Sequence, residues 1–127
     1  MPDPCDVTRD FIMAYGTGEV AGLRQRLAED FVGYVTNADA GVDRVDGPDA
    51  YVSRLPDLAA AGGSARVTQC VQVSTDQALT MVEIRAQRDG RDLHNFGAFL
   101  SRVDADGRIC ELWMVDALPS YSDEFWS

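Results

Sequence analysis

The second half of the chain alternates apolar and polar residues, and a period of two predicts β-strands. One strand is expected from residue 65 to about residue 75, and two more lie on either side of Asp89 and Gly90. A further strand follows the polar segment 104–107. Because Asp-Gly favours a two-residue hairpin turn, residues 76–116 are predicted to form an antiparallel meander.

The first half of the chain shows helical spacing instead. Asp3 and Pro4 are typical of a helix start, and apolar side chains then recur until Gly16, namely Val7, Phe11, Ile12 and Tyr15. A second short helix is expected to begin at residues 17–18 and to continue to Leu27, with one apolar face.

Between these helices and the meander, the pattern predicts a strand over residues 31–37, a polar loop over residues 38–46 and a third helix. The third helix begins at residues 47–48, and Pro56 must kink or end it. Its buried stripe would consist of Tyr51, Leu55 and Leu58. The length fits a single domain over residues 1–127.

Turn chemistry predicts which side chains share a face of the sheet. A type I′ turn at Asp89 and Gly90 sets Arg88 opposite Arg91, Ile84 opposite Asn95, Val82 opposite Gly97 and Thr80 opposite Phe99. A four-residue loop at 104–107 sets Val103 opposite Arg108, Leu112 opposite Phe99, Met114 opposite Gly97 and Asp116 opposite Asn95. A one-residue bulge would exchange part of this assignment between the faces.

These registers give the sheet one nearly apolar face. This face carries a row of apolar side chains, namely Ile84, Val82, Phe99, Leu112 and Met114. The row ends where Asn95 lies beside Asp116. We expect this face to be concave and to meet the helices. The opposite, convex face would carry Glu83, Arg85, His94, Phe96 and Trp113.

Asp116 is the first candidate for a catalytic residue. A carboxylate beside apolar walls loses hydration, which favours a role in proton transfer. The amide of Asn95 could hold this carboxylate or polarise a substrate carbonyl. The alternative is structural, because a carboxylate at a strand end can cap backbone amides or pair with an arginine at the rim.

His94 is the second candidate, and it is the sole histidine of the chain. The predicted register places it across from Arg85 and close to Glu83, an arrangement that could orient the imidazole as a base. A surface or interface histidine is the alternative. A bulge that turned the ring inward would make a pair with Asp116 available.

Three tyrosines could supply hydroxyl donors to a cavity. Tyr15 follows Phe11 by one helical turn, so its phenol could reach inward. Tyr34 and Tyr51 offer similar groups from the first strand and the third helix. Core packing is the alternative for each of them.

Composition narrows the chemistry further. The formal net charge is −10, and 11 arginines supply all the basic side chains apart from the histidine, which disfavours nucleic acid as a partner and excludes a Schiff-base lysine. Cys5, Cys70 and Cys110 lack the spacing of a disulfide framework or zinc site, so we expect reduced thiols and a cytoplasmic protein. No apolar run approaches about 20 residues, so no membrane association is expected.

The sequence does not predict a metal or cofactor site. The series Asp39, Asp43, Asp46 and Asp49 lacks the alternate-residue ligands and terminal glutamate of a calcium-binding EF-hand loop, and a solvated acidic loop is the preferred interpretation. No glycine-rich phosphate loop follows a predicted strand. We therefore expect no metal and no cofactor.

The order of elements, with the closing strand Ile-Cys-Glu-Leu-Trp-Met-Val-Asp after a glycine turn, resembles the nuclear transport factor 2-like superfamily, particularly its SnoaL-like branch. The resemblance covers nearly the whole chain. It implies an α+β fold in which a curved, mostly antiparallel β-sheet wraps around three N-terminal helices and forms a conical pocket. It also implies a homodimer through the convex sheet face. The aromatic tail with Pro119, Tyr121, Phe125 and Trp126 would pack across a sheet edge or against the partner.

Ketosteroid isomerases, which the chain resembles in layout, need a tyrosine in the first helix and two aspartates on the sheet. Those positions fall on Phe11, Val35 and Phe99. None of these side chains can transfer a proton, so an isomerase of that type is excluded.

The leading prediction is a cofactor-free lyase, cyclase or isomerase that uses acid/base catalysis on a hydrophobic, carbonyl-containing molecule of polyketide, steroid or terpenoid type. Asp116 would remove a proton next to a carbonyl that Asn95 or Tyr15 polarises. The predicted pocket consists of Tyr15, Phe31, Tyr34, Tyr51, Leu55, Val82, Asn95, Phe99, Leu112 and Met114. The alternative is a non-catalytic module that binds a hydrophobic ligand or a second subunit.

Overall fold

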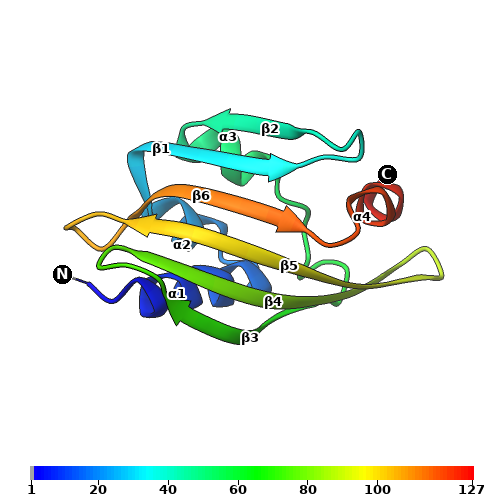
Figure 1. Cartoon of the computed structure of the whole chain (residues 1–127). Coiled ribbons are helices and arrows are strands. Elements are labelled where there is room, and N and C mark those ends of the chain that lie inside the picture. Colours follow the sequence, from blue (N-terminus) through cyan, green and yellow to red (C-terminus); the bar gives the residue numbers. More distant parts are fainter. Residues whose placement is uncertain (1) are drawn as a thin grey trace.

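The computed structural model describes residues 2–127, which form one six-stranded sheet and four helices (Figure 1). In chain order the elements are α1 (Pro4–Thr17), α2 (Val20–Gln25), β1 (Leu27–Thr36), β2 (Val42–Asp46), α3 (Pro48–Arg54), β3 (Ser64–Gln72), β4 (Gln77–Arg88), β5 (Arg91–Val103), β6 (Ile109–Asp116) and α4 (Pro119–Trp126). The predicted α+β class is confirmed.

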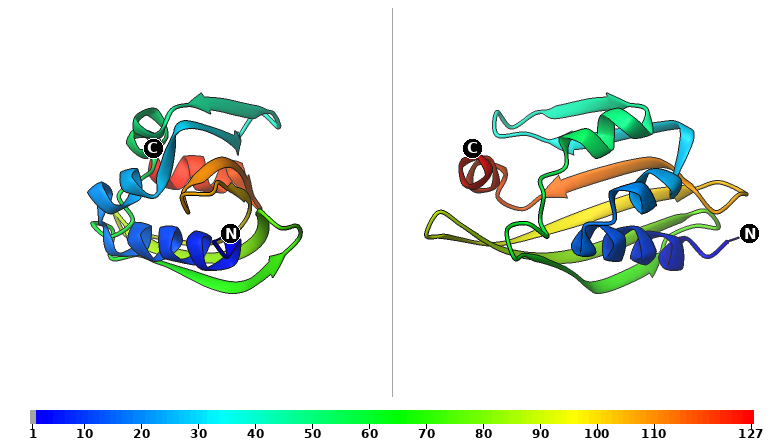
Figure 2. Two further views of the ribbon diagram at one scale, coloured as in Figure 1. Left: turned by 90° about the vertical axis from the view of Figure 1, so that its left-hand side faces the viewer. Right: turned by 180° about the vertical axis from the view of Figure 1, so that it is seen from behind.

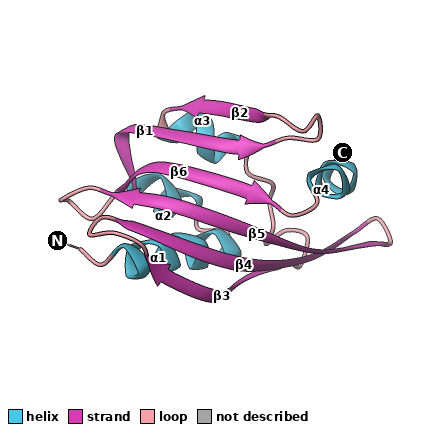
Figure 3. Cartoon of the chain, in the orientation of Figure 1, coloured by secondary structure: helices cyan, strands magenta, loops and turns pink. Residues whose placement is uncertain are grey.

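The sheet has the strand order β2-β1-β6-β5-β4-β3, and the parallel pair of β1 and β6 joins otherwise antiparallel neighbours. Figure 2 shows the sheet curved around α1, α2 and α3, which lie together against its concave face. The fourth helix, α4, lies beyond the end of β6 (Figure 3). The three predicted helices therefore cover the concave face, and α4 is an addition to the predicted layout.

Helix α1 begins and ends where its sequence signals lie. Oδ1 of Asp3 accepts a hydrogen bond from the backbone N–H of Cys5 at 2.8 Å, which caps the first turn. Gly18 ends the helix in the left-handed region, with a φ of 76°, where glycine carries no steric penalty. The helix is joined to β5 by a buried hydrogen bond of 2.7 Å between the hydroxyls of Thr8 and Ser101.

The β4–β5 hairpin has the predicted register at every position. Arg88 pairs with Arg91, and Ile84 pairs with Asn95. Asp89 and Gly90 both have positive φ values, of 51° and 76°, as a type I′ turn requires.

The predicted register of β5 and β6 is wrong by two residues. Gly97 pairs with Asp116, Phe99 with Met114, Ser101 with Leu112 and Val103 with Ile109. The side chain of Asp104 accepts hydrogen bonds from the backbone N–H groups of Asp106 and Arg108, which keeps Arg108 within the turn. This turn moves the pairing by one residue, so that Val103 pairs with Ile109 and not with Arg108. An irregularity between Arg102 and Val103 moves the pairing by one residue more. Because the two shifts add to an even number, every side chain keeps its predicted face.

Three further boundaries differ from the prediction. Leu27 begins β1 and does not end a helix, and residues 42–46, predicted as loop, pair with β1 as β2. The aromatic tail forms α4, and Phe125 is buried at 3 % exposure among Leu58, Ala86 and Leu93 of the same chain. The tail therefore packs within its own chain against β4 and β5, which are interior strands of the sheet, and not across a sheet edge as predicted.

No helix among residues 2–127 combines the length and the apolar composition that a bilayer crossing requires.

Replacing Gly33 of β1 by alanine should destabilise the fold. An ideal Cβ at this position would lie 2.8 Å from Cδ2 and 3.0 Å from Cε2 of Tyr51, whose side chain is 1 % exposed and has little room to move. Overpacking of this kind costs about 1–3 kcal/mol, measured as the free energy of unfolding in urea.

Gly16→Ala in α1 is the matched control. Its Cβ would lie 3.6 Å from the nearest atom, the backbone N of Ala65, which is ordinary contact. Alanine restricts the unfolded chain more than glycine, so this variant should be neutral or stabilised by up to about 1 kcal/mol. Equal losses in both variants would contradict the packing described for Gly33.

Candidate functional site

A cavity of about 460 Å³ lies between the concave face of the sheet and helices α1, α3 and α4. Its buried lining is mostly apolar and includes Phe11, Ile12, Tyr51, Leu93 and Phe99. Its more exposed lining is polar and includes Asn37, Asp43, Arg54, Asp116 and Asp123. The polar residues therefore mark the opening. The volume and the lining suit a small, largely apolar molecule.

Asn95 and Asp116 meet at this opening, although they are diagonal neighbours and not direct partners in the register. Nδ2 of Asn95 donates to Oδ1 of Asp116 over 2.6 Å. The same oxygen accepts the backbone N–H of Leu118 at 2.8 Å, and Asn95 Nδ2 also donates to the Leu118 carbonyl at 3.4 Å. Asn95 is 4 % exposed, so the two side chains anchor the residue before α4 from inside the fold.

The second carboxylate oxygen of Asp116, Oδ2, has no hydrogen-bond or ionic partner among residues 2–127. The two donors on Oδ1 orient the carboxylate, and both belong to neutral amides. A fixed carboxylate with one free oxygen in the lining of an apolar cavity is suited to accept a proton from a bound molecule.

Tyr15 lines the cavity as predicted, but its hydroxyl is engaged. The hydroxyl donates to the backbone carbonyl of Pro56 over 3.1 Å. Burial raises the pKa of Tyr15 well above its usual range, and the negative charge of Asp57 adds to this effect. The phenol is therefore neutral and holds the segment after α3.

Tyr51 also lines the cavity, from the middle of α3. Its ring packs edge-on against Phe31 with ring centroids 5.0 Å apart, and it passes over Gly33 at the close distances given above. Burial raises the pKa of Tyr51 well above its usual range, the neighbouring Tyr15 adds to this effect, and the cation of Arg54 opposes it to a smaller extent. This phenol is neutral as well.

Tyr34 does not line the cavity, in contrast to the prediction. Gly33 faces inward against Tyr51, and successive strand residues point to opposite faces, so Tyr34 points outward. There its ring stacks on Trp113 with centroids 4.0 Å apart. The sequence pattern of β1 does not reveal this assignment, because aromatic and apolar residues occur on both of its faces.

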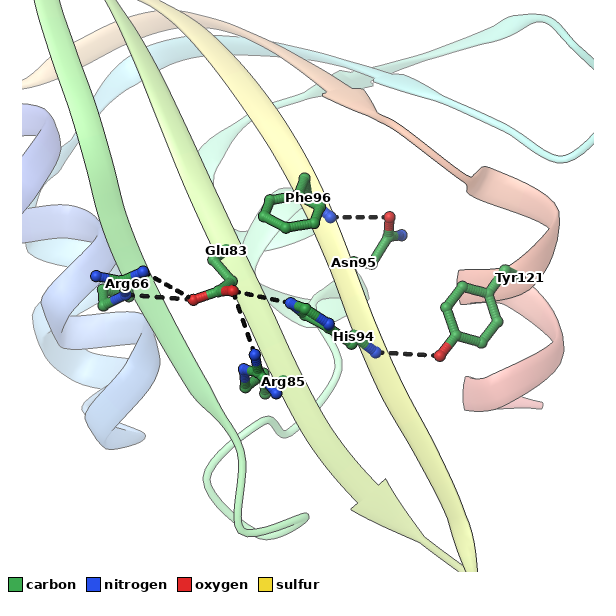
Figure 4. Close-up of polar contacts among 7 residues, drawn as sticks. All are labelled: Arg66, Glu83, Arg85, His94, Asn95, Phe96 and Tyr121. Atoms are coloured by element: carbon green, nitrogen blue, oxygen red, sulfur yellow. Dashed lines mark hydrogen bonds and ion pairs between the residues drawn. The ribbon is translucent and has the colours of Figure 1, made fainter.

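His94 lies on the convex face, away from the cavity (Figure 4). Nε2 of His94 is 2.8 Å from Oε2 of Glu83, and the carboxylate also binds Arg66 at 3.1 Å and Arg85 at 3.5 Å. The hydrogen bond to His94, followed by that from Arg66, lowers the pKa of Glu83. The structure therefore does not bring His94 together with Asp116.

The remaining predicted pocket residues fall into two groups. Four of them line the cavity together with Tyr15 and Tyr51, namely Leu55, Asn95, Phe99 and Met114. The others belong to the packed core and not to the cavity lining, namely Phe31, Val82 and Leu112. They lie on the predicted face, but at depths where other side chains cover them.

Sequence reasoning missed a charged group at the opening. Nη2 of Arg54 binds Oδ2 of Asp43 at 3.2 Å, and Nδ2 of Asn37 donates to the other oxygen at 3.0 Å. The hydrogen bond from Asn37, followed by that from Arg54, lowers the pKa of Asp43. The sequence does contain one signal for this group. Arg54 follows Tyr51 by about one helical turn, which places the two residues on the same side of the helix.

Three of the four aspartates in the acidic series around β2 are paired with arginines. Asp43 pairs with Arg54, Asp46 with Arg44 and Asp49 with Arg24. Within the described residues, no three His, Cys, Asp or Glu side chains are grouped to hold a metal ion.

Solved structures with the same fold have different descriptions. A protein of unknown function with a cystatin-like fold from Xanthomonas campestris has a TM-score of 0.76 at 23% identity and covers 99% of both chains. IdmH from Streptomyces antibioticus, described as a proposed polyketide cyclase, has a TM-score of 0.71 at 20% identity, with 97% of this chain and 98% of that chain covered. An LEH-like epoxide hydrolase of Mycobacterium tuberculosis has a TM-score of 0.74 at 15% identity, with 96% of this chain and 88% of that chain covered.

At these identities the structural likeness shows the fold alone. No curated protein matches the sequence. The model of the SnoaL-like domain matches residues 8–112, which span α1 through the middle of β6 and therefore most of the cavity lining. The chain therefore belongs to the SnoaL-like domain family, within the nuclear transport factor 2-like superfamily.

Proposed function

We propose that the cavity binds a hydrophobic small molecule that contains a carbonyl group, and that Asp116 acts on it as the acid/base residue of a cofactor-free lyase, cyclase or isomerase. The observation that carries this proposal is the fixed carboxylate of Asp116, a residue of the cavity lining, with Oδ1 held by Asn95 and Leu118 and Oδ2 without a partner among residues 2–127.

In the proposed step, Oδ2 of Asp116 takes a proton from a carbon next to the carbonyl. The C–H bond breaks, and its electron pair moves toward the carbonyl to give an enolate. Closure of a ring, loss of a leaving group or return of the proton at another carbon would complete the cyclase, lyase or isomerase reaction respectively. Because the side-chain amide of Asn95 carries no charge, it does not form an ion pair with the Asp116 carboxylate that would compete with the proton.

Structural relatives support an enzyme of this general kind. The proposed polyketide cyclase and the epoxide hydrolase named above share the fold over almost the whole chain. Both descriptions concern chemistry on organic molecules, which agrees with a largely apolar cavity. They do not distinguish among the three reaction types.

A non-catalytic ligand-binding module remains the second candidate, and one observation favours it. Asn95 and Asp116 hold the backbone of Leu118, so both side chains have a structural role at the start of α4. If Asp116 serves only this structural role, its carboxylate does not need to react with a ligand.

Asp116→Asn separates the two candidates. Asparagine can keep an oxygen at the Oδ1 position, so the contacts to Asn95 and Leu118 should survive, while the proton acceptor at Oδ2 is lost. For the proposed enzyme, turnover should fall by about 10²–10⁴-fold with ligand binding largely retained. The measurement is product formation by chromatography for every ketone, sterol or terpenoid that raises the melting temperature.

Asp89→Asn is the matched control, because it removes the same charge at the β4–β5 turn, where the φ of 51° also suits asparagine. It should leave turnover unchanged. Full turnover by Asp116→Asn would contradict catalysis by this carboxylate, and ligands that bind both proteins without reaction would support the binding module.

We further propose that the convex face forms a homodimer. By the alternation of side chains along the strands, this face exposes Leu79, Met81, Phe96, Trp113 and Val115, each between 38 % and 49 % accessible. An apolar surface of this kind is typical of an interaction site. The tail does not take part through Phe125, because that side chain is buried in its own chain.

The wild type should therefore sediment as a dimer at micromolar concentration, and Met81→Glu should sediment as a monomer because it buries a charge in the interface. Val20→Glu, which changes an exposed apolar residue of α2, should remain a dimer. A monomeric wild type would remove the dimer proposal and leave the cavity unaffected.

A further inference from the structure

Two of the groups predicted to polarise a substrate oxygen are already engaged within the protein. The amide nitrogen of Asn95 donates to Oδ1 of Asp116 and to the Leu118 carbonyl. The hydroxyl proton of Tyr15 is donated to the Pro56 carbonyl. A ligand oxygen could bind either group only by displacing these contacts.

The hydroxyl of Tyr51 is different, because it has no hydrogen-bond partner among residues 2–127. Every completely buried polar side-chain atom of these residues does have a partner. The Tyr51 side chain is 1 % exposed, so this small exposure must include the hydroxyl. Since Tyr51 belongs to the cavity lining, we infer that this exposed hydroxyl opens on the cavity.

The position of the ring is set by its neighbours and leaves the hydroxyl little freedom. Phe31 packs against one side of the ring, and Gly33 provides the space for its Cδ2–Cε2 edge. Burial keeps this phenol protonated at neutral pH, so it is available as a donor. An unpaired buried donor is costly, and a ligand acceptor would relieve that cost.

We propose that the Tyr51 hydroxyl donates a hydrogen bond to the carbonyl oxygen of the bound molecule, and that this contact makes the cavity selective for oxygen-bearing apolar ligands over hydrocarbons of the same shape. The proposal rests on the proposed function in that the cavity holds a small molecule. It does not depend on catalysis by Asp116.

Arg54 also lies near Tyr51, and its situation is different. Its guanidinium is paired with Asp43 and its side chain is 39% exposed, so water competes for its remaining N–H groups. A hydrogen bond from Tyr51 lies in a drier environment and discriminates more strongly between a ligand with an oxygen and one without it.

The test uses 9-fluorenone and fluorene, two flat tricycles that differ at one ring position, a carbonyl in the first and a methylene in the second. Fluorenone carries no hydrogen on the carbons next to its carbonyl, so Asp116 cannot convert it, and binding is measured apart from any reaction. The dissociation constants of both probes are determined for the wild type, Tyr51→Phe and Tyr15→Phe, together with the melting temperature of each protein.

The wild type should bind fluorenone about 3- to 10-fold more tightly than fluorene, after the two dissociation constants are corrected for the partition of each probe into octanol. This is the gain in affinity that one hydrogen bond provides. Tyr51→Phe should lose this preference while its melting temperature stays the same or rises. The infrared C=O stretch of bound fluorenone should move to higher frequency in Tyr51→Phe, because the donor is gone.

Tyr15→Phe should show the opposite pattern, because its hydroxyl bonds to the protein. Its melting temperature should fall by about 3–6 °C, and the preference for fluorenone should persist. An unchanged preference and an unchanged C=O stretch in Tyr51→Phe would overturn the proposal. A lower melting temperature of Tyr51→Phe would also contradict it, since it would show that the hydroxyl is paired within the protein. Failure of both probes to bind would contradict it as well.

Discussion

The hydrogen bond between Asn95 and Asp116 is the contact on which the candidate site depends. It joins β5 to β6 across a diagonal, and through Leu118 it sets where α4 begins. The far end of α4 is held by Arg91, which donates to the carbonyls of Glu124 and Phe125. Because α4 contributes Ser122, Asp123 and Trp126 to the lining, the same two side chains that could perform chemistry also help to build the opening.

The distribution of charge between the two faces follows from strand alternation. On the convex face, Glu83 is surrounded by His94, Arg66 and Arg85. On the concave face, the carboxylate of Asp116 has only amide donors. Hydrogen bonds from His94 and Arg66 favour the ionised form of Glu83 and lower its pKa. The proposed acid/base role of Asp116 therefore rests on its position in the lining and on Oδ2, which has no partner among residues 2–127.

The sequence predicts the fold well where local chemistry decides it. Asp89 and Gly90 both favour positive φ, so the hairpin register and the position of Asn95 follow from two residues. The β5–β6 register depends on hydrogen bonds of the Asp104 side chain and on a bulge, which turn composition does not encode; Asp116 still meets Asn95 because the error is even. The outward direction of Tyr34 depends on the tertiary contact of Gly33 with Tyr51, which no local pattern reveals. Helical spacing from Tyr51 indicates where Arg54 lies, but its pairing with Asp43 depends on tertiary structure.

The proposed ligand site is the space between the sheet and helices α1, α3 and α4, with Asp116 in its wall. A crystal structure of the protein soaked with 9-fluorenone would show whether this space binds a ligand. The tricycle should lie inside the cavity, among Phe11, Phe99 and Met114, with Oδ2 of Asp116 facing it. A cavity filled by its own side chains, with the probe absent or bound only to the convex face, would show that this space is not a ligand site.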